Sequence, residues 1–64
     1  MKLKTLIPLV GNCYVTIWRK DGKDMMRVVA RGFSRNENNF EKYQNKNVTS
    51  IRPTWNSTLS ITVE

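Results

Sequence analysis

Apolar and polar residues alternate most clearly on either side of Asp21-Gly22. Both flanks are rich in β-branched residues. An Asp-Gly pair between such flanks is typical of a two-residue type I′ turn, because both central positions need a positive φ. A turn of this length fixes the register, with Trp18 opposite Met25 and Ile17 opposite Met26. The pattern therefore predicts a β-hairpin centred on this turn.

This register divides the predicted hairpin, Asn12–Gly32, into two surfaces, because residues directly opposite each other share a face of a sheet. The first surface is apolar, is expected to face the core and is closed at the turn by an Arg19–Asp24 pair; it consists of Cys13, Val15, Ile17, Met26, Val28 and Ala30. The second surface is basic and aromatic, and consists of Asn12, Tyr14, Thr16, Trp18, Met25, Arg27, Val29 and Arg31. We therefore expect one buried face and one face that is free to contact a partner.

The segment before the hairpin has a helical spacing of its apolar residues, which are Leu3, Leu6, Ile7 and Val10. Thr5 can cap a short helix and Gly11 can end it, so we expect a helix over about Thr5–Val10. Pro8 fits this helix, because the first turn leaves N–H groups without helical partners in any case. The alternative is an edge β-strand over Lys2–Val10.

A polar, asparagine-rich stretch follows the hairpin and leads into a second helical segment. Asn38 or Asn39 can cap one or two turns near Asn39–Gln44. Phe40 and Tyr43 are three residues apart, so they point to the same side of such a turn. We expect this segment to lie over the core face of the sheet.

The chain ends in a second predicted hairpin, between strands over Val48–Pro53 and Thr58–Val63. In the last strand, apolar residues alternate with Ser, Thr and Glu, which is typical of a half-buried strand. Ile51 lies beside Ile61 on the core face only if the loop holds an odd number of residues. A Trp55-Asn56-Ser57 loop meets this condition, since asparagine tolerates a left-handed φ.

The order helix, two strands, short helix, two strands predicts an α+β fold. We expect one domain over residues 1–64, with a four-stranded, mainly antiparallel sheet of two hairpins and the short helices on one face. A small β-barrel of the SH3 or OB type is the alternative if Lys2–Val10 forms a strand. A chain of 64 residues buries only a modest core, so we also expect a homo-oligomer.

The charge balance favours an anionic partner. The chain holds 11 Lys and Arg against 5 Asp and Glu, which gives a net charge of +6 and a pI near 10.0. Nucleotides, nucleic acids and acidic host proteins suit such a balance, and solubility alone is the alternative explanation. Cys13, the single cysteine, is interpreted as a small buried apolar residue. With no secretory signal pattern and no apolar run of membrane-spanning length, we expect a cytoplasmic protein.

The residue sets that usually carry catalysis are missing. The chain has no histidine, and its five acidic residues show no paired spacing. One cysteine without histidine excludes an ordinary zinc site, and the three glycines are too isolated to form a phosphate-binding loop. We therefore expect no enzymatic activity, no metal and no cofactor.

Basic and aromatic residues remain as the candidate binding site, and they are Tyr14, Trp18, Arg27, Arg31, Arg52 and Trp55. Aromatic rings on a sheet surface can stack on bases while neighbouring cations meet phosphates. Arg27 and Arg31 are four residues apart on one predicted strand, so we expect both to point the same way. Trp55 in a turn either packs on the rim of the sheet or is held for a partner. Trp18 can instead cover the sheet or form a dimer interface.

Four segments of the chain carry a resemblance to a type of protein: the start Lys2–Val10, Val15-Thr16-Ile17-Trp18 followed by Asp21-Gly22, Val48–Pro53, and Thr58–Val63. In these segments the chain resembles the small uncharacterised proteins of about this length that are encoded by phages and prophages of Gram-positive bacteria. The resemblance implies an accessory factor that acts by binding a component of the phage or of the host bacterial cell. It implies no catalytic or ligand-binding residue.

Three functional hypotheses follow. The first is a non-enzymatic phage accessory protein that inhibits a host defence component, or sequesters an anionic nucleotide signal, through the second surface of the first hairpin. The second hypothesis is a single-stranded nucleic-acid-binding module that uses the same surface. The third is a structural, dimer-forming protein. The salt dependence of binding distinguishes the first two hypotheses, because nucleic-acid binding weakens steeply with salt whereas inhibition through an apolar patch does not.

Overall fold

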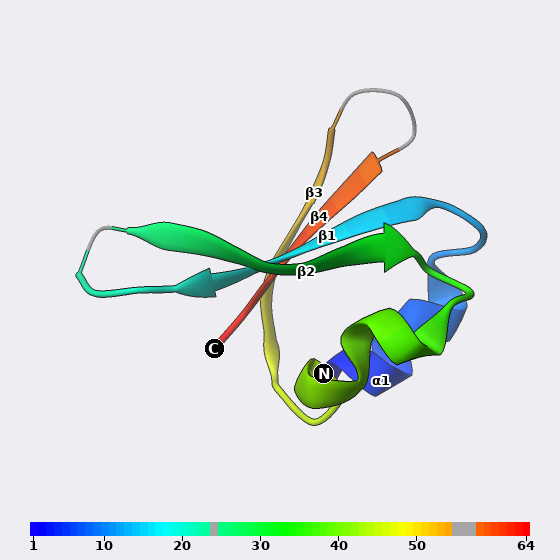
Figure 1. Cartoon of the computed structure of the whole chain (residues 1–64), viewed down its shortest axis with the longest axis horizontal. Helices are drawn as coiled ribbons and strands as arrows, with labels where there is room; N and C mark the ends of the chain where they lie inside the picture. The colour runs from blue at the N-terminus through cyan, green and yellow to red at the C-terminus, as the bar shows by residue number, and fades with distance from the viewer. Residues whose placement is uncertain (24, 55–57) are drawn as a thin grey trace.

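The computed structural model describes residues 1–23, 25–54 and 58–64, and its strands form one open four-stranded sheet (Figure 1). The elements in chain order are α1 (Leu3–Leu6), η1 (Ile7–Leu9), β1 (Tyr14–Lys20), β2 (Met26–Phe33), η2 (Glu37–Tyr43), β3 (Val48–Pro53) and β4 (Thr58–Val63). The strand order is β2-β1-β4-β3, with two antiparallel hairpins joined through a parallel β1–β4 pair. The predicted α+β fold of two hairpins with short helices is confirmed, and the barrel does not form.

The first helix begins earlier than predicted, at Leu3 instead of after Thr5. The backbone N–H groups of Leu3 and Lys4 donate to the carbonyl oxygens of Lys46 and Gln44, each at 3.0 Å. These two carbonyls satisfy helix N–H groups that otherwise lack partners, so no side-chain cap is needed and the predicted Thr5 cap is wrong. The strand alternative for this segment is also wrong.

Pro8 and Gly11 take the roles that their residue types suggest. Pro8 lies at the start of η1, where its missing N–H costs nothing. Gly11 follows the helical segment with a φ of 73°, a backbone conformation that favours glycine. The chain then turns into β1.

The helices cover one face of the sheet, and the core lies between the helices and this face. The buried apolar side chains are Leu3, Leu6, Ile7, Val15, Ile17, Phe40, Ile61 and Val63. Val15 and Ile17 come from β1, as predicted, and Cys13 and Ala30 pack against the same cluster. Phe40 is buried and Tyr43 packs against the same cluster, which confirms the predicted side of η2. This segment is a 3-10 helix that begins two residues before the predicted turn.

Gly32 lets η2 lie close to the end of β2. It faces Val15 across the β1–β2 pair and has a φ of 156°. A Cβ atom at this position would lie 2.0 Å from Nδ2 of Asn39. A larger residue would therefore clash with the side chain of Asn39, which would have to move.

The first hairpin has a different register from the predicted one. Ile17 faces Ala30 and Trp18 faces Val28, so Val29 is an extra residue that forms a β-bulge. The prediction paired Ile17 with Met26. The observed partner of Ile17 lies four positions further along the chain than the predicted one. The observed partner of Trp18 lies three positions further than predicted.

The longer connection between the strands explains this shift. β1 ends at Lys20 and β2 begins only at Met26, and the N–H of Asp21 donates to the carbonyl oxygen of Met25 at 2.7 Å. Gly22 does adopt a positive φ, 83°, but it lies in a wider turn than a two-residue type I′ turn. The pattern of β-branched residues predicts where the two strands lie, but it does not predict the length of the loop between them.

The shift moves several predicted residues to the other face, because a slip by an odd number of residues inverts a strand. Met26 and Val28 lie on the uncovered face, so their assignment to the core is wrong. Arg27 lies opposite Arg19 on the helix side. Asp24, the predicted partner of Arg19, lies outside the described residues. Val29 was expected on the uncovered face and instead packs against the core. Beyond the bulge the slip is even, and the remaining residues keep their predicted faces.

The second hairpin is confirmed, with the predicted strand bounds and with Ile51 opposite Ile61. Ile51 shares the helix-side face with Ile61 but is 46% exposed, so it is not part of the buried core. The N–H of Thr54 donates to the carbonyl oxygen of Thr58 at 2.8 Å and closes the ladder. A bulge at Thr49 shifts the register near the other end of β3. The predicted loop, residues 55–57, lies outside the described residues.

Candidate functional site

The face of the sheet opposite the helices, here called the open face, gathers the predicted aromatic and basic residues. Residues paired across neighbouring strands share a face, so the pairings define rows that cross the sheet. The first row is Phe33, Tyr14 and Thr58; the second is Arg31, Thr16, Ser60 and Arg52; the third is Val28, Trp18, Thr62 and Ser50. The open face therefore carries rings on both sides of a row of cations and hydroxyls.

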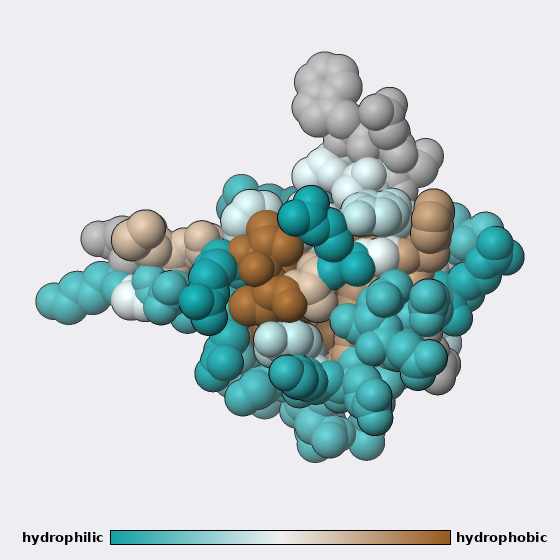
Figure 2. All heavy atoms as spheres, viewed as in Figure 1, coloured by the Kyte–Doolittle hydropathy of each residue, from teal (hydrophilic) through white to brown (hydrophobic). Residues whose placement is uncertain are grey.

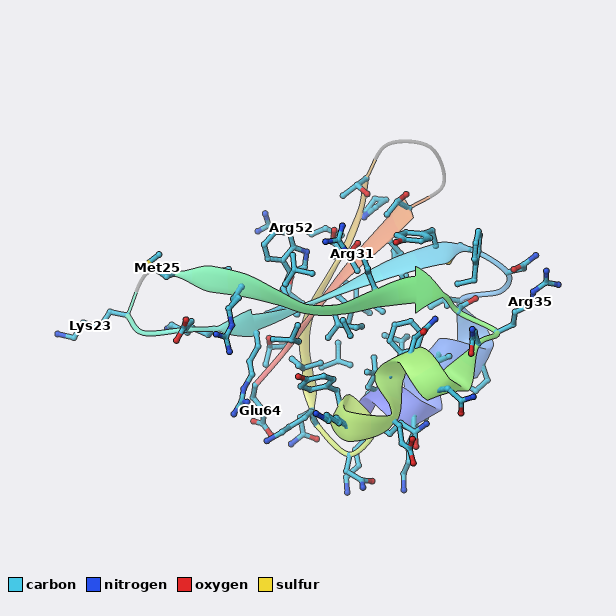
Figure 3. The ribbon with its side chains drawn as sticks, in the orientation of Figure 1. Lys23, Met25, Arg31, Arg35, Arg52 and Glu64 are labelled. Carbon is cyan, nitrogen blue, oxygen red and sulfur yellow. The ribbon has the colours of Figure 1, made fainter. Side chains whose placement is uncertain are left out.

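The central row has an exposed arginine at each end and two hydroxyl groups between them. Arg31 belongs to the edge strand β2 and Arg52 to the edge strand β3, while Thr16 and Ser60 belong to the inner strands. Three strand spacings separate the Cα atoms of the arginines, which is about 14 Å. Figure 3 shows both arginine side chains extending to the same side of β2. Guanidinium groups in this arrangement can meet two anionic groups, or two ends of one ligand.

Aromatic rings lie one row above and one row below this central row. Tyr14 and Trp18 are the β1 residues two positions on either side of Thr16, so each lies about 7 Å from it along the strand. The ring of Tyr14 meets that of Phe33 edge-to-face, with centroids 5.4 Å apart. Phe33 is 56% exposed, so this aromatic pair is open to a ligand.

Trp18 borders a hollow of about 550 Å³ on the open face. Arg52, Thr62 and Ser60 line the same hollow, and Met26 closes it at the hairpin. This volume lies within the range of small-molecule sites, roughly 300–1,000 Å³. Figure 2 shows hydrophobic atoms along the middle of β2 with hydrophilic side chains around them. A ring, a guanidinium group and hydroxyls thus converge on one concave surface.

Ser34, buried beneath the end of β2, fixes the strand ends that carry the aromatic pair. Its side chain is 2% exposed. The Ser34 hydroxyl donates to the carbonyl oxygen of Gly11 and accepts from the N–H of Cys13 at 3.2 Å. The Ser34 N–H donates to the carbonyl oxygen of Cys13 at 2.8 Å. Because Tyr14 follows Cys13 and Phe33 precedes Ser34, these bonds hold both rings in register.

The structure brings together four of the six predicted site residues. Tyr14, Trp18, Arg31 and Arg52 share the open face. Arg27 points to the opposite side, so the expectation that it shares a face with Arg31 is wrong; the bulge between them inverts the alternation. Trp55 lies outside the described residues.

Sequence reasoning missed the contribution of Phe33 and of the hydroxyl residues on the inner strands. Phe33 begins the polar stretch that the sequence predicts after the first hairpin, and only the longer turn and the bulge bring it opposite Tyr14. The alternation in β4 does indicate an outward polar side for Ser60 and Thr62. The parallel β1–β4 pairing, which the sequence pattern does not indicate, is what places them beside Thr16 and Trp18.

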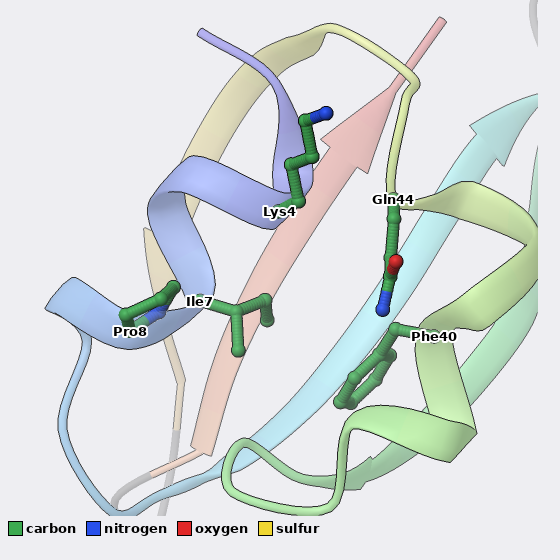
Figure 4. A pocket seen from close by; sticks show the side chains of 5 residues that line it. All are labelled: Lys4, Ile7, Pro8, Phe40 and Gln44. Carbon is green, nitrogen blue, oxygen red and sulfur yellow. The ribbon is translucent and has the colours of Figure 1, made fainter.

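A second, smaller pocket lies between the helical segments on the other side of the molecule (Figure 4). Its volume is about 120 Å³, and Lys4, Ile7, Pro8, Phe40 and Gln44 line it. A water molecule occupies about 30 Å³ in the liquid, so this pocket holds only a few atoms. It is too small for a nucleotide.

Within residues 1–23, 25–54 and 58–64, no group of three or more His, Cys, Asp or Glu residues is placed to hold a metal ion. None of the helical segments in this part of the chain has the length and apolarity needed to cross a membrane.

Comparison with known proteins gives no match: no family model, no curated protein and no solved structure is similar to this chain. The geometry of the open face therefore carries the functional argument.

Proposed function

We propose that this chain is a non-enzymatic binding protein that holds an anionic nucleotide ligand on the open face of its sheet. The observation that supports the proposal is the row Arg31–Thr16–Ser60–Arg52 between the Tyr14–Phe33 pair and Trp18. A nucleotide presents a flat aromatic base and a phosphate close together. This row offers hydroxyls and guanidinium groups, and the rows on either side of it offer aromatic rings.

Each part of the ligand has a partner of suitable chemistry. A base stacked on Trp18 gains about 1–3 kcal/mol. A phosphate that meets Arg31 or Arg52 accepts charge-assisted hydrogen bonds, which are about twice as strong as neutral ones. The hydroxyls of Thr16 and Ser60 can donate to phosphate oxygens or bond the sugar. The net charge of +6 adds a general attraction for anions.

The proposed setting is that of a phage accessory protein in the cytoplasm of a host bacterial cell. There, a small protein of this kind would sequester an anionic nucleotide signal and so inhibit a host defence. The resemblance of four chain segments to small phage and prophage proteins supports this setting. Binding alone suffices for such a role, and no reaction is required.

Calorimetric titration of the full chain tests the proposal, with the 5′-phosphorylated dinucleotide pApA as the probe. Trp18→Ala and the double variant Arg31→Gln/Arg52→Gln should each weaken binding about tenfold or more. The control Lys4→Gln/Lys42→Gln removes the same charge from two exposed helix residues and should change affinity less than about twofold. Equal losses from the two double variants would replace the site with diffuse electrostatics, and failure of the unmodified chain to bind pApA would overturn the proposal.

Self-association through the open face is a second candidate function, favoured by the apolar side chains exposed there. Met26 is 44% exposed and Phe33 is 56% exposed, and both lie on this face. A second copy could cover them and form the homo-oligomer expected from the short chain. Light scattering at high micromolar concentration should then give a dimer mass that Phe33→Ser reduces. A monomer mass at that concentration would contradict this candidate.

A further inference from the structure

The hairpin formed by β1 and β2 extends beyond the helices (Figure 1). Its end carries a cluster of positively charged residues. Arg19 and Arg27 lie directly opposite each other, on the face that carries the helices further along the sheet. Both are exposed, as are Lys20 and Lys23, and Figure 3 shows Lys23 at the tip. The hairpin therefore presents cations on both of its faces.

Two arginines directly opposite each other on an exposed hairpin oppose folding, because like charges at such positions repel. Among the described residues, Asp21 and Lys20 line the same surface hollow as the two arginines, so this lining carries one negative charge against three positive charges. Across an antiparallel pair the Cα atoms are about 5 Å apart, so both guanidinium groups can reach one phosphate. A bound polyanion would turn this repulsion into a binding contact.

The position of this pair connects it to the open face. Arg19 follows Trp18 in β1 and points to the other side of the same strand. β2, which carries Arg27, is an edge strand of the sheet. A ligand that extends from Trp18 across β2 can therefore bend round this edge of the sheet and contact the Arg19–Arg27 pair on the opposite face. A single nucleotide on Trp18 cannot span both faces, whereas a polymer can.

We infer that the ligand of the open face is a single-stranded nucleic acid, which stacks its bases on the open face and continues round the β2 edge to the Arg19–Arg27 pair. This inference rests on the proposed nucleotide-binding role of the open face. A single strand suits the surface better than a duplex, because only unpaired bases are free to stack on Trp18 and on the Tyr14–Phe33 pair. Small β-domains that bind single strands cover about 4–16 nucleotides.

The test compares a short and a long ligand by fluorescence anisotropy on the full chain, using labelled oligo-dT of about 3 and about 12 nucleotides and a duplex of the longer length. Arg19→Gln/Arg27→Gln should weaken binding of the 12-mer about tenfold and that of the trimer less than about twofold. The slope of log affinity against log salt for the 12-mer should become shallower by about 1.4, since each phosphate contact in a single strand contributes about 0.7. Lys4→Gln/Lys42→Gln is the control with the same loss of charge.

The outcomes separate this inference from the function on which it rests. If Trp18→Ala abolishes trimer binding while Arg19→Gln/Arg27→Gln affects the 12-mer no more than the control does, the open face binds nucleotides and the extended path is wrong. A duplex that binds more tightly than the 12-mer would also overturn the single-strand assignment. If Trp18→Ala leaves trimer binding unchanged, the open face itself is not the site and both proposals fail. Thermal melts of each variant verify that the fold is intact.

Discussion

Arg31 and Arg52 stand at the two ends of one row across the sheet, although they belong to different hairpins. Neither hairpin alone could align them. The parallel pairing of Thr16 with Ser60 joins the hairpins in the register that completes the row. The candidate site is thus a product of how the two halves of the chain meet.

The first prediction concerns which side of the first hairpin faces the core. Ile17→Asp should unfold the domain, because Ile17 is fully buried and the new carboxylate would have no partner there. Val28→Asp is the matched control and should leave the chain folded, since Val28 lies on the open face. Circular dichroism melts measure both variants. If the two substitutions are equally destructive, the bulge at Val29 and the register around it are wrong.

A second prediction tests the Ser34 clamp. Ser34→Ala should lower the free energy of unfolding by about 1–3 kcal/mol, because it removes a hydrogen-bond partner of the Cys13 N–H and of the Gly11 carbonyl in a buried place. Thr5→Ala should change stability by less than about 0.5 kcal/mol, since Thr5 is exposed and caps no helix. Urea denaturation compares the two. A neutral Ser34→Ala variant would show that the clamp does not hold the strand ends.

The third prediction separates stability from binding on the projecting hairpin. Arg27→Glu places an opposite charge across from Arg19 and should stabilise the fold by about 0.2–1 kcal/mol. The same substitution should weaken binding of long single-stranded DNA, because a repelling carboxylate replaces a phosphate contact. Melting and anisotropy on one sample measure both effects. Loss of stability, or tighter binding, would contradict the role given to this pair.

Much of the fold could be predicted because local patterns and long-range packing agree. In the second hairpin, only an odd number of loop residues places Ile51 beside Ile61, and the two residues do face each other, although Ile51 is 46% exposed. The first hairpin lacks such a constraint, since Val28 and Val29 are equally suited to burial. A longer turn and a bulge then pack Val29 against the core and place Val28 on the open face, and no local signal separates this arrangement from the tighter one.

The candidate site was predictable only in part for the same reason. Tyr14 and Trp18 alternate with the buried residues of β1, so their face follows directly from the core. The orientation of Arg27 depends on the bulge, and the approach of Arg52 to Trp18 depends on the parallel β1–β4 pair. Pairings between distant parts of the chain leave no periodic trace in a sequence, so a single hairpin cannot indicate them.

The measurement that tests the central claim most directly is an amide and indole NMR titration of the full chain with pApA. Binding at the open face should change the chemical shifts of the Thr16 and Ser60 amides and of the Trp18 indole N–H, because the side chains of all three residues lie on this face. The amides of Lys4 and Phe40, on the helical side, should stay in place. Chemical-shift changes confined to those helical residues, or no change at millimolar pApA, would contradict nucleotide binding at the open face.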